Sequence, residues 1–250
     1  MYSPYLKKFW QSLFSFNGVF GLTLILIWGI FRFIIVLHAN KTGNYQWVSV
    51  IFISMWVTPF LFLNQAGRKQ IGIKKPRKYA WLLYSFVLGM LCCALMFLVA
   101  TALYGDTISN WFVYISRSYP IASDSFPMGE KWSIFWVYAL IGMTFSPIGE
   151  ELFYRGLVHE SFALQWDERK ASLVDSTAFA VTHLAHFGIV YVSGTWEVLV
   201  GPGLLWTGLL FGTCIVFFIC RQKTDSILGA ILSHAGYNFA MTYFIFFHVL

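Results

Sequence analysis

The sequence IFWVYALIGMTFSPIGEELFYR (Ile134–Arg155) joins an apolar run typical of a membrane-spanning helix to three charged side chains. An ionisable group near the centre of a bilayer costs about 2.5–3.5 kcal/mol on insertion scales, so such a cluster needs partners or water. On a helix, Glu151 and Arg155 share one face, whereas Glu150 points about 100° away from Glu151. The spacing predicts that Arg155 neutralises Glu151 and leaves Glu150 free to act as a base in a functional site.

Pro147 lies one helical turn before the two glutamates. Proline has no N–H to bond to the carbonyl of Met143, so we expect the helix to bend and to open a polar crevice beside the carboxylates. The alternative interpretation of the charged cluster is an ion pair at the membrane edge that only fixes the depth of the helix.

The composition is typical of an integral membrane protein. Of the 250 residues, 58% are hydrophobic and 11% are charged, whereas about a quarter of a soluble domain is charged. The net charge of +6 comes from basic residues in short segments between apolar runs, which indicates topology signals and argues against a nucleic-acid partner. The four cysteines lie in or beside apolar runs without C-x-x-C spacing, so neither a disulfide framework nor a zinc site is indicated.

Seven apolar segments have lengths near that needed to cross about 30 Å of hydrocarbon. They predict an all-α fold, a polytopic membrane bundle of about seven transmembrane helices in a lipid bilayer, with the catalytic core in the last four. The segments are Phe16–Leu37, Trp47–Leu63, Ala80–Tyr104, Trp132–Tyr154, Leu173–Val192, Gly203–Cys220 and Ile227–Phe247.

Lysine and arginine residues are distributed unevenly between the two ends of these segments. Three of them, Lys41, Arg117 and Lys131, fall on one side. Thirteen fall on the other side: Lys7, Lys8, Arg68, Lys69, Lys74, Lys75, Arg77, Lys78, Arg155, Arg169, Lys170, Arg221 and Lys223. Because basic loops stay in the cytoplasm, the bias predicts a cytoplasmic N-terminus and an active site towards the cytoplasmic side. Arg32, inside the first segment, could pair or could extend to the interface.

The sequence divides into two regions. Residues 1–131 are expected to form an N-terminal membrane region of three helices, with a basic cytoplasmic loop (Gly67–Lys78) and a long outer segment (Gly105–Lys131). Residues 132–250 are expected to form the catalytic membrane core. Within this core, Gly208 and Gly212 have the G-x-x-x-G spacing that permits close packing of helices.

Histidines in two later segments are expected at a depth similar to that of Glu150. His183 comes about ten residues into the fifth segment and His234 about seven into the seventh, roughly 5–15 Å below the cytoplasmic boundary. His234 and Asn238 share a helix face and offer two donors to one point, which suits a developing oxyanion. Hydrogen bonds between helices are the alternative role for these side chains. Asp175, at the start of the fifth segment, is expected to cap that helix or to lie in its first turn.

Three short motifs follow one another on successive hydrophobic segments: E-E-x-x-x-R at Glu150–Arg155, F-x-x-x-H at Phe179–His183 and H-x-x-x-N at His234–Asn238. In this order they resemble the CAAX prenyl endopeptidase and its bacterial relatives, the CPBP (Abi) family of intramembrane glutamic proteases. The resemblance covers about Trp132–Phe247. It implies an intramembrane endopeptidase that cleaves a membrane-associated protein or peptide, and the compact chain would suit a bacterial cytoplasmic membrane.

The resemblance also implies a role for each residue of the motifs. Glu150 with His183 would activate a water for attack on a peptide carbonyl, and His234 with Asn238 would hold the oxyanion. The route is chemically reasonable because a partly desolvated glutamate is a stronger base than one in water. The supporting residues that orient the site would be Glu151 and Arg155.

A metal mechanism is the chemical rival, because Glu150, His183 and His234 are possible zinc ligands. The sequence has no H-E-x-x-H motif and zinc would leave Asn238 unused, so no cofactor is expected. Two other classes of function could use the same residues: a non-catalytic immunity or interaction protein, and a small transporter or proton relay. The sequence does not choose between prenylated proteins and bacteriocin-type peptides as substrates, and it does not indicate an oligomeric state.

Overall fold

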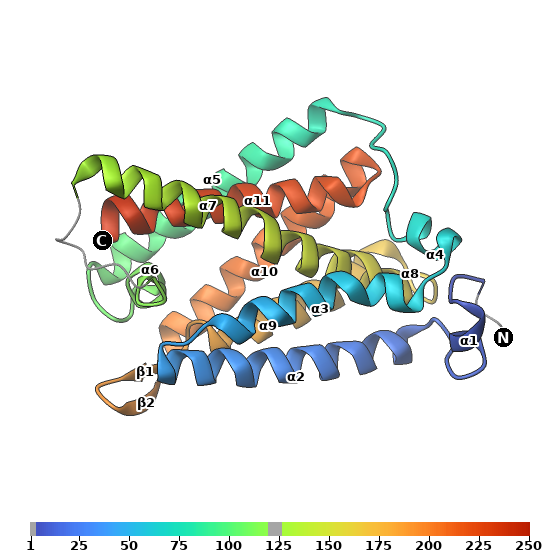
Figure 1. Cartoon of the computed structure of the whole chain (residues 1–250), viewed down its shortest axis with the longest axis horizontal. Coiled ribbons are helices and arrows are strands. Elements are labelled where there is room, and N and C mark those ends of the chain that lie inside the picture. Colours follow the sequence, from blue (N-terminus) through green and yellow to red (C-terminus); the bar gives the residue numbers. More distant parts are fainter. Residues whose placement is uncertain (1–3, 120–126) are drawn as a thin grey trace.

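The computed structural model describes residues 4–119 and 127–250, so part of the predicted outer segment lies outside the described residues. The described residues form a bundle of long helices with the two termini at opposite ends (Figure 1), which confirms the predicted all-α membrane fold. In chain order the elements are α1 (Lys8–Gln11), α2 (Gly18–Thr42), α3 (Gln46–Phe62), α4 (Gln65–Gln70), α5 (Ala80–Tyr104), α6 (Trp111–Ser116), α7 (Met128–Glu151), the π-helix η1 (Leu152–Val158), α8 (His159–Ala163), α9 (Glu168–Thr182), the 3-10 turn η2 (His183–Ala185), β1 (Ile189–Val192), β2 (Thr195–Val198), α10 (Val200–Thr224), α11 (Ile227–Phe244) and the π-helix η3 (Ile245–Val249).

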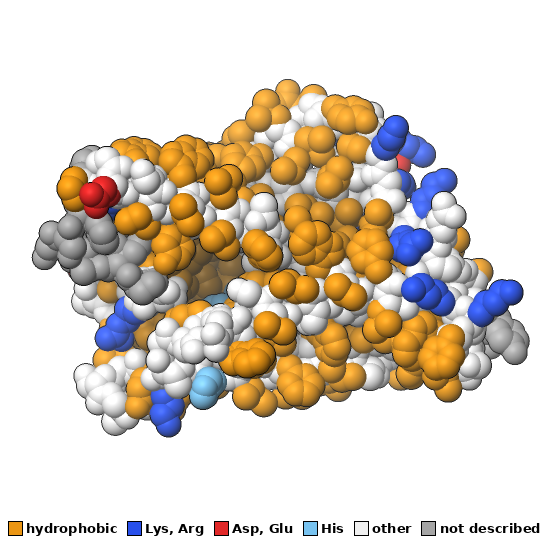
Figure 2. Space-filling model, in the orientation of Figure 1, with side chains coloured by type: hydrophobic (Ala, Val, Ile, Leu, Met, Phe, Trp, Pro, Cys, Tyr) orange, Lys and Arg blue, Asp and Glu red, His pale blue; other side chains and the backbone are white. Residues whose placement is uncertain are grey.

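Four helices within the described residues are long and apolar enough to cross a membrane: α2, α5, α10 and the continuous stretch Gly129–Ala163 that contains most of α7. The 15 residues of α9 span only about 22 Å, which is less than the hydrocarbon thickness. Hydrophobic side chains cover most of the visible face, and Lys and Arg side chains gather mainly at the end near α1 and α4 (Figure 2). The protein is therefore an integral membrane protein whose seven expected segments correspond to helices of unequal length.

The fifth predicted segment is misplaced at its start. α9 begins at Glu168 because the side chain of Asp167 accepts a hydrogen bond from the backbone N–H of Lys170, 2.9 Å away. Asp175, the expected cap or first-turn residue, instead lies fully buried in the middle of this helix. The prediction for Asp175 is therefore wrong, and the actual cap is the earlier aspartate.

The same segment is also misplaced at its end, since α9 stops before His183 and not at Val192. After the η2 turn, Gly188 adopts a φ of 112°, which is open to glycine, and the chain enters the antiparallel β1–β2 hairpin. Apolar and aromatic residues before the Ser193–Gly194 turn are the local sequence signal for this hairpin. His183 therefore lies just beyond the end of a helix, and not in the middle of a membrane span.

Glycines bring α5 and α11 together, and these two helices make the most extensive contact in the bundle. A Cβ atom on Gly89 would collide with the backbone carbonyl oxygen of Ser233, and one on Gly236 would collide with the backbone of α5. By contrast, nothing lies within 4 Å of a Cβ placed on Gly208 or Gly212. The predicted close packing at the G-x-x-x-G of α10 is therefore wrong, because those positions face open space.

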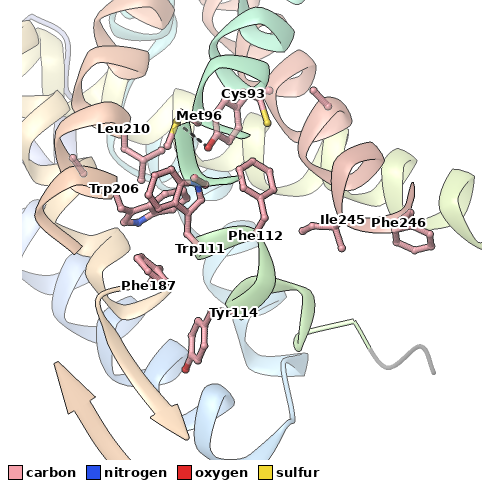
Figure 3. Packing of buried hydrophobic residues seen from close by; sticks show 14 of the residues in the cluster. Cys93, Met96, Trp111, Phe112, Tyr114, Phe187, Trp206, Leu210, Ile245 and Phe246 are labelled. Carbon is pink, nitrogen blue, oxygen red and sulfur yellow. Dashed lines mark hydrogen bonds between the residues drawn. The ribbon is translucent and has the colours of Figure 1, made fainter. Parts of the chain in front are cut away.

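A buried aromatic core surrounds the short helix α6 (Figure 3). Trp111 and Phe112 are fully buried, and the ring of Trp111 lies 5.7 Å from that of Trp206 on α10, centroid to centroid. The hydroxyl of Tyr114 accepts a hydrogen bond from the backbone N–H of Tyr191, 2.9 Å away, and so ties β1 to α6. These contacts fix the position of α10, whose Trp206 also forms part of the wall of a polar cavity.

Candidate active site

A cavity of about 140 Å³ lies between α2, α7, α9, α10 and α11. Aromatic and aliphatic side chains form most of its wall, and several polar side chains from distant parts of the sequence share the remainder. The structure thus brings together all four side chains that the sequence proposes as catalytic, while the proposed supporting residues Glu151 and Arg155 lie behind the wall. The polar lining includes Arg32, Ser146, Glu150, His183, His186, Thr213, His234 and Asn238.

Glu150 is the buried acid of this cavity, with an exposed fraction of 1%. Its Oε1 atom lies 2.6 Å from Nη2 of Arg32, and its Oε2 atom accepts a hydrogen bond of 2.6 Å from the hydroxyl of Ser146. Oε2 also lies 3.8 Å from Nε2 of His234. Glu150, which the sequence predicted to be left free by Arg155 to act as a base, thus has a counterion that α2 supplies.

Arg32 contacts both Glu150 and two histidines that line the cavity. Its guanidinium donates to the hydroxyl of Thr182 at 3.0 Å and lies 3.0 Å from Nε2 of His183 and 3.3 Å from Nε2 of His186. The side chain is 1% exposed, so the ambiguity left by the sequence is resolved in favour of pairing with Glu150. The only local signal for its role was a lone charge within an apolar segment.

The contacts of His183 define its tautomer. Nδ1 lies 2.7 Å from the backbone carbonyl oxygen of Phe179, closer than its 3.3 Å to Nη1 of Arg32, and Nε2 lies 3.0 Å from Nη2 of Arg32. A carbonyl oxygen only accepts hydrogen bonds and a guanidinium only donates them, so Nδ1 carries the proton and Nε2 offers its lone pair. His183 is therefore neutral in this arrangement, and its lone pair is directed at Arg32.

Glu151 and His234 form a second pair behind Glu150. The Nδ1 atom of His234 lies 2.8 Å from Oε1 of Glu151, and Arg155 Nε lies 3.3 Å from Oε2 of Glu151, which confirms the predicted Glu151–Arg155 ion pair. Because the carboxylate accepts the proton on Nδ1, the Nε2 lone pair of a neutral His234 is directed away from it. Glu151 therefore orients His234 so that Nε2 is the nitrogen nearer to Glu150.

A chain of buried charges continues from Arg155 away from the cavity. Arg155 Nε lies 3.6 Å from Asp175, which in turn lies 2.7 Å from Nδ1 of His159. The other ring nitrogen of His159 is 3.0 Å from Glu168, and that hydrogen bond lowers the pKa of the Glu168 carboxyl. An imidazole can donate from both nitrogens only when it is protonated, so two carboxylates stabilise the charged form of His159. The sequence reasoning did not find this network, although Arg155 and His159 are spaced four residues apart.

The helix changes its geometry at the point where these charges are placed. α7 contains Pro147 and continues, without a break in the chain, into the π-helical segment η1, Leu152–Val158, which carries Arg155. π-Helical turns are rare and frequently occur at functional sites. Every side chain of η1 is buried, so this segment presents Arg155 to Glu151 and Asp175 inside the protein.

Asn238 has a contact that the sequence did not indicate. Its Nδ2 donates a hydrogen bond of 2.9 Å to the backbone carbonyl oxygen of Gly142, which joins α11 to α7. An amide nitrogen carries two N–H groups, so one remains for another acceptor. Asn238 thus holds two walls of the cavity together while keeping one donor.

The directions of the ligand atoms do not fit a zinc ion bound by Glu150, His183 and His234. A metal needs the lone pairs of its ligands to converge on one point. Here the guanidinium of Arg32 receives the lone pairs of Glu150 and His183. Within residues 4–119 and 127–250, no group of three His, Cys, Asp or Glu side chains is placed to hold a metal.

Comparison with known proteins bears on the same part of the chain. Residues 132–240 match the family model described as Rce1-like, type II CAAX prenyl endopeptidase Rce1-like. No curated protein and no solved structure matches the chain. The matched stretch contains the acid and the histidines of the cavity but not Arg32. The stretch 132–240, which carries the buried acid and the histidines gathered in this cavity, is thus similar to the Rce1-like family of type II CAAX prenyl endopeptidases.

Proposed function

We propose that the protein is an intramembrane endopeptidase that hydrolyses a peptide bond of a membrane-associated protein or peptide with a water activated by Glu150. The family is one of proteases, which supports endopeptidase activity in general. The observation that carries the finer proposal is the 3.8 Å separation between Oε2 of the buried Glu150 and Nε2 of His234 inside the cavity.

That separation suits a water between the two groups. It is too long for a direct hydrogen bond, yet one oxygen can lie within hydrogen-bond distance of both atoms. Glu150 would take a proton from this water while the oxygen attacks the peptide carbonyl carbon. The tetrahedral intermediate would then collapse with cleavage of the C–N bond, and the proton held by Glu150 would pass to the leaving amine.

In this proposal His234 replaces His183 as the partner of Glu150 across the water. His183 was the partner that the sequence resemblance implied, but its lone pair is directed at Arg32. Glu151 fixes the tautomer of His234, in the way that a carboxylate orients the histidine of other hydrolytic sites. The free N–H of Asn238 is available to the carbonyl oxygen of the substrate.

The test uses purified protein in detergent with a panel of membrane peptides that includes prenylated and bacteriocin-type sequences. We expect Glu150→Gln to lower the cleavage rate by about 10²–10⁴-fold, because loss of a general base costs that much. The matched control is Glu160→Gln, which changes a buried glutamate that pairs with Arg221 outside this cavity. Full activity of Glu150→Gln would contradict the proposal.

A chelator arm tests the metal-free mechanism separately. We expect cleavage by the wild-type protein to be unchanged after treatment with a zinc chelator. If the chelator abolishes cleavage and zinc restores it, the mechanism proposed here is wrong. If the wild-type protein cleaves no peptide, and Glu150→Gln binds the same partners as the wild type, a non-catalytic interaction protein becomes the better hypothesis.

A further inference from the structure

We propose that Arg32 is a catalytic residue that donates to the carbonyl oxygen of the scissile peptide bond and stabilises its developing negative charge. This inference rests on the proposed endopeptidase function and deepens it. It concerns a residue of α2, which lies outside the stretch 132–240 that matches the family model.

The first observation is an unused donor beside the cavity. Arg32 lines the cavity and is 1% exposed, yet its Nε–H has no hydrogen-bond partner among the described residues. Buried N–H groups without a partner are rare in native proteins, and a charged one is the most costly to leave unpaired. The acceptor that the proposed reaction brings into this cavity is a peptide carbonyl oxygen.

The second observation is that Arg32 has a single charged partner among residues 4–119 and 127–250. Apart from Glu150, its hydrogen-bond partners in this part of the chain are neutral groups: the hydroxyl of Thr182 and the ring nitrogens of His183 and His186. When Glu150 takes the proton of the attacking water, its negative charge disappears as the oxyanion forms on the substrate. Arg32 would therefore exchange one anionic partner for another without any change in the net charge of the site.

The third observation is that Arg32 is held in place before substrate arrives. Its guanidinium carbon lies 5.8 Å from the ring centroid of Phe52 and 5.9 Å from that of Phe179. These rings and the two histidine acceptors limit the movement of the guanidinium. A donor that is already oriented needs no reorganisation when charge develops, which is the source of strong oxyanion stabilisation.

Arg155 shows why burial alone does not identify such a residue. It is also fully buried, but it does not line the cavity. Its partners are the two carboxylates of Glu151 and Asp175. Arg155 is thus balanced by charges of the protein, whereas Arg32 faces the space in which a substrate would lie.

The experiment compares Arg32→Lys with Arg221→Lys in the full-length protein. Arg221 provides a matched control because its Nη2 lies 2.6 Å from Glu160, the distance between Arg32 and Glu150, and its side chain is 8% exposed. It lies at a different cavity of about 640 Å³ near the basic end. We expect Arg32→Lys to lower kcat by about 10²-fold with little change in KM, because lysine keeps the charge but loses the planar set of donors. We expect Arg221→Lys to leave kcat within about 2-fold of the wild type.

A second variant separates catalysis from folding. Arg32→Ala leaves a space the size of a guanidinium, and we expect millimolar guanidinium ion to restore part of its cleavage rate without restoring that of Glu150→Gln. The inference would be overturned by a wild-type kcat in Arg32→Lys or by a kcat in Arg32→Ala above that of Arg32→Lys. It would also be overturned if guanidinium ion did not restore cleavage by a folded Arg32→Ala variant. If Glu150→Gln is inactive and Arg32→Lys is fully active, only the role of Arg32 fails. If Glu150→Gln is fully active, the proposed function itself fails.

Discussion

Each carboxylate of the adjacent pair Glu150 and Glu151 has an arginine of its own. Arg32 from α2 pairs with Glu150, and Arg155 from η1 pairs with Glu151. Only Glu150 also faces the cavity, so two acids that are neighbours in the sequence occupy different environments. One is available to a substrate, and the other is enclosed by the protein and His234.

The role of Glu151 can be tested by Glu151→Gln. The amide can still accept the Nδ1 proton of His234, but it no longer balances the charge of Arg155. We expect kcat to fall about 10–100-fold, as for other partners that orient a ligand or base, with KM nearly unchanged. Steady-state kinetics checks this result, and an unchanged kcat would show that catalysis does not need the negative charge of Glu151.

Asp175 is expected to matter for stability more than any exposed acid. Asp175→Ala would remove a counter-charge from Arg155 and an acceptor from His159. Breaking a buried ion pair in this way costs about 3–5 kcal/mol of unfolding free energy. Denaturant unfolding in mild detergent measures the loss, and the control Asp167→Ala should lose only about 1 kcal/mol, the value of a helix cap. Equal losses in both variants would contradict the buried network.

At the scale of elements, the pair α5 and α11 depends on backbone contact at glycine. Gly89→Ala would force its Cβ into the carbonyl oxygen of Ser233, and neither backbone can move away cheaply. We expect it to destabilise the protein by about 1–3 kcal/mol. Gly208→Ala should be neutral or stabilise by about 0.5–1 kcal/mol, because alanine favours the helix and nothing lies near its Cβ. Thermal unfolding of both variants tests the opposite signs.

The elements also show what a single sequence can predict. The apolar segments and the Glu151–Arg155 pair follow from hydropathy and from helical spacing, which are local properties. The partner of Glu150 does not follow, because Arg32 reaches it only through the packing of α2 against the later helices. Likewise, the G-x-x-x-G spacing at Gly208 indicates that another helix could pack closely there. Only the fold decides which glycines lie at a close contact between helices.

The prediction of the fifth segment was wrong for a different physical reason. A short apolar run can be a helix or a strand, and the residues after His183 were read as a continued helix although their glycines favour a turn. The acidic network was missed because Asp175 was assigned to a helix end, where a polar residue would be solvated. In the structure that residue lies inside the protein and binds His159.

For the whole molecule, the ion pairs of Asp225 with Lys74 and Arg77 at the basic end make stability depend on pH. A hydrogen bond from Lys74 lowers the pKa of Asp225, the residue between α10 and α11. Since the folded pKa lies below the unfolded value of about 3.9, the contribution is complete above that value and is lost as pH falls through the folded pKa. We expect Asp225→Asn to lower the free energy of unfolding at pH 7 by less than about 1 kcal/mol, which would appear as a slightly lower melting temperature. The difference from the wild type should vanish at strongly acidic pH, and a difference that persists there would contradict the ion pairs as its cause.

The uneven distribution of basic residues gives an expected orientation in the membrane. Lys69 and Glu197 are exposed at opposite ends of the bundle, on α4 and on β2. In a Cys92→Ser background, in which the remaining cysteines are buried, we expect Lys69→Cys to be labelled by a thiol reagent only after the cytoplasm is made accessible. Glu197→Cys should be labelled in intact cells. The reverse pattern would place the basic end outside.

The position of Arg32 on α2 has a consequence for transplanting this catalytic centre. A chimaera that joins residues 132–250 to the first helices of another membrane protein would carry every motif residue and still lack the guanidinium beside Glu150. The orphaned carboxylate would have to find a new cation or become protonated. Designers who graft the motif-bearing half should therefore move α2 with it, since the recipient's own first helix would otherwise have to offer an arginine at the same depth.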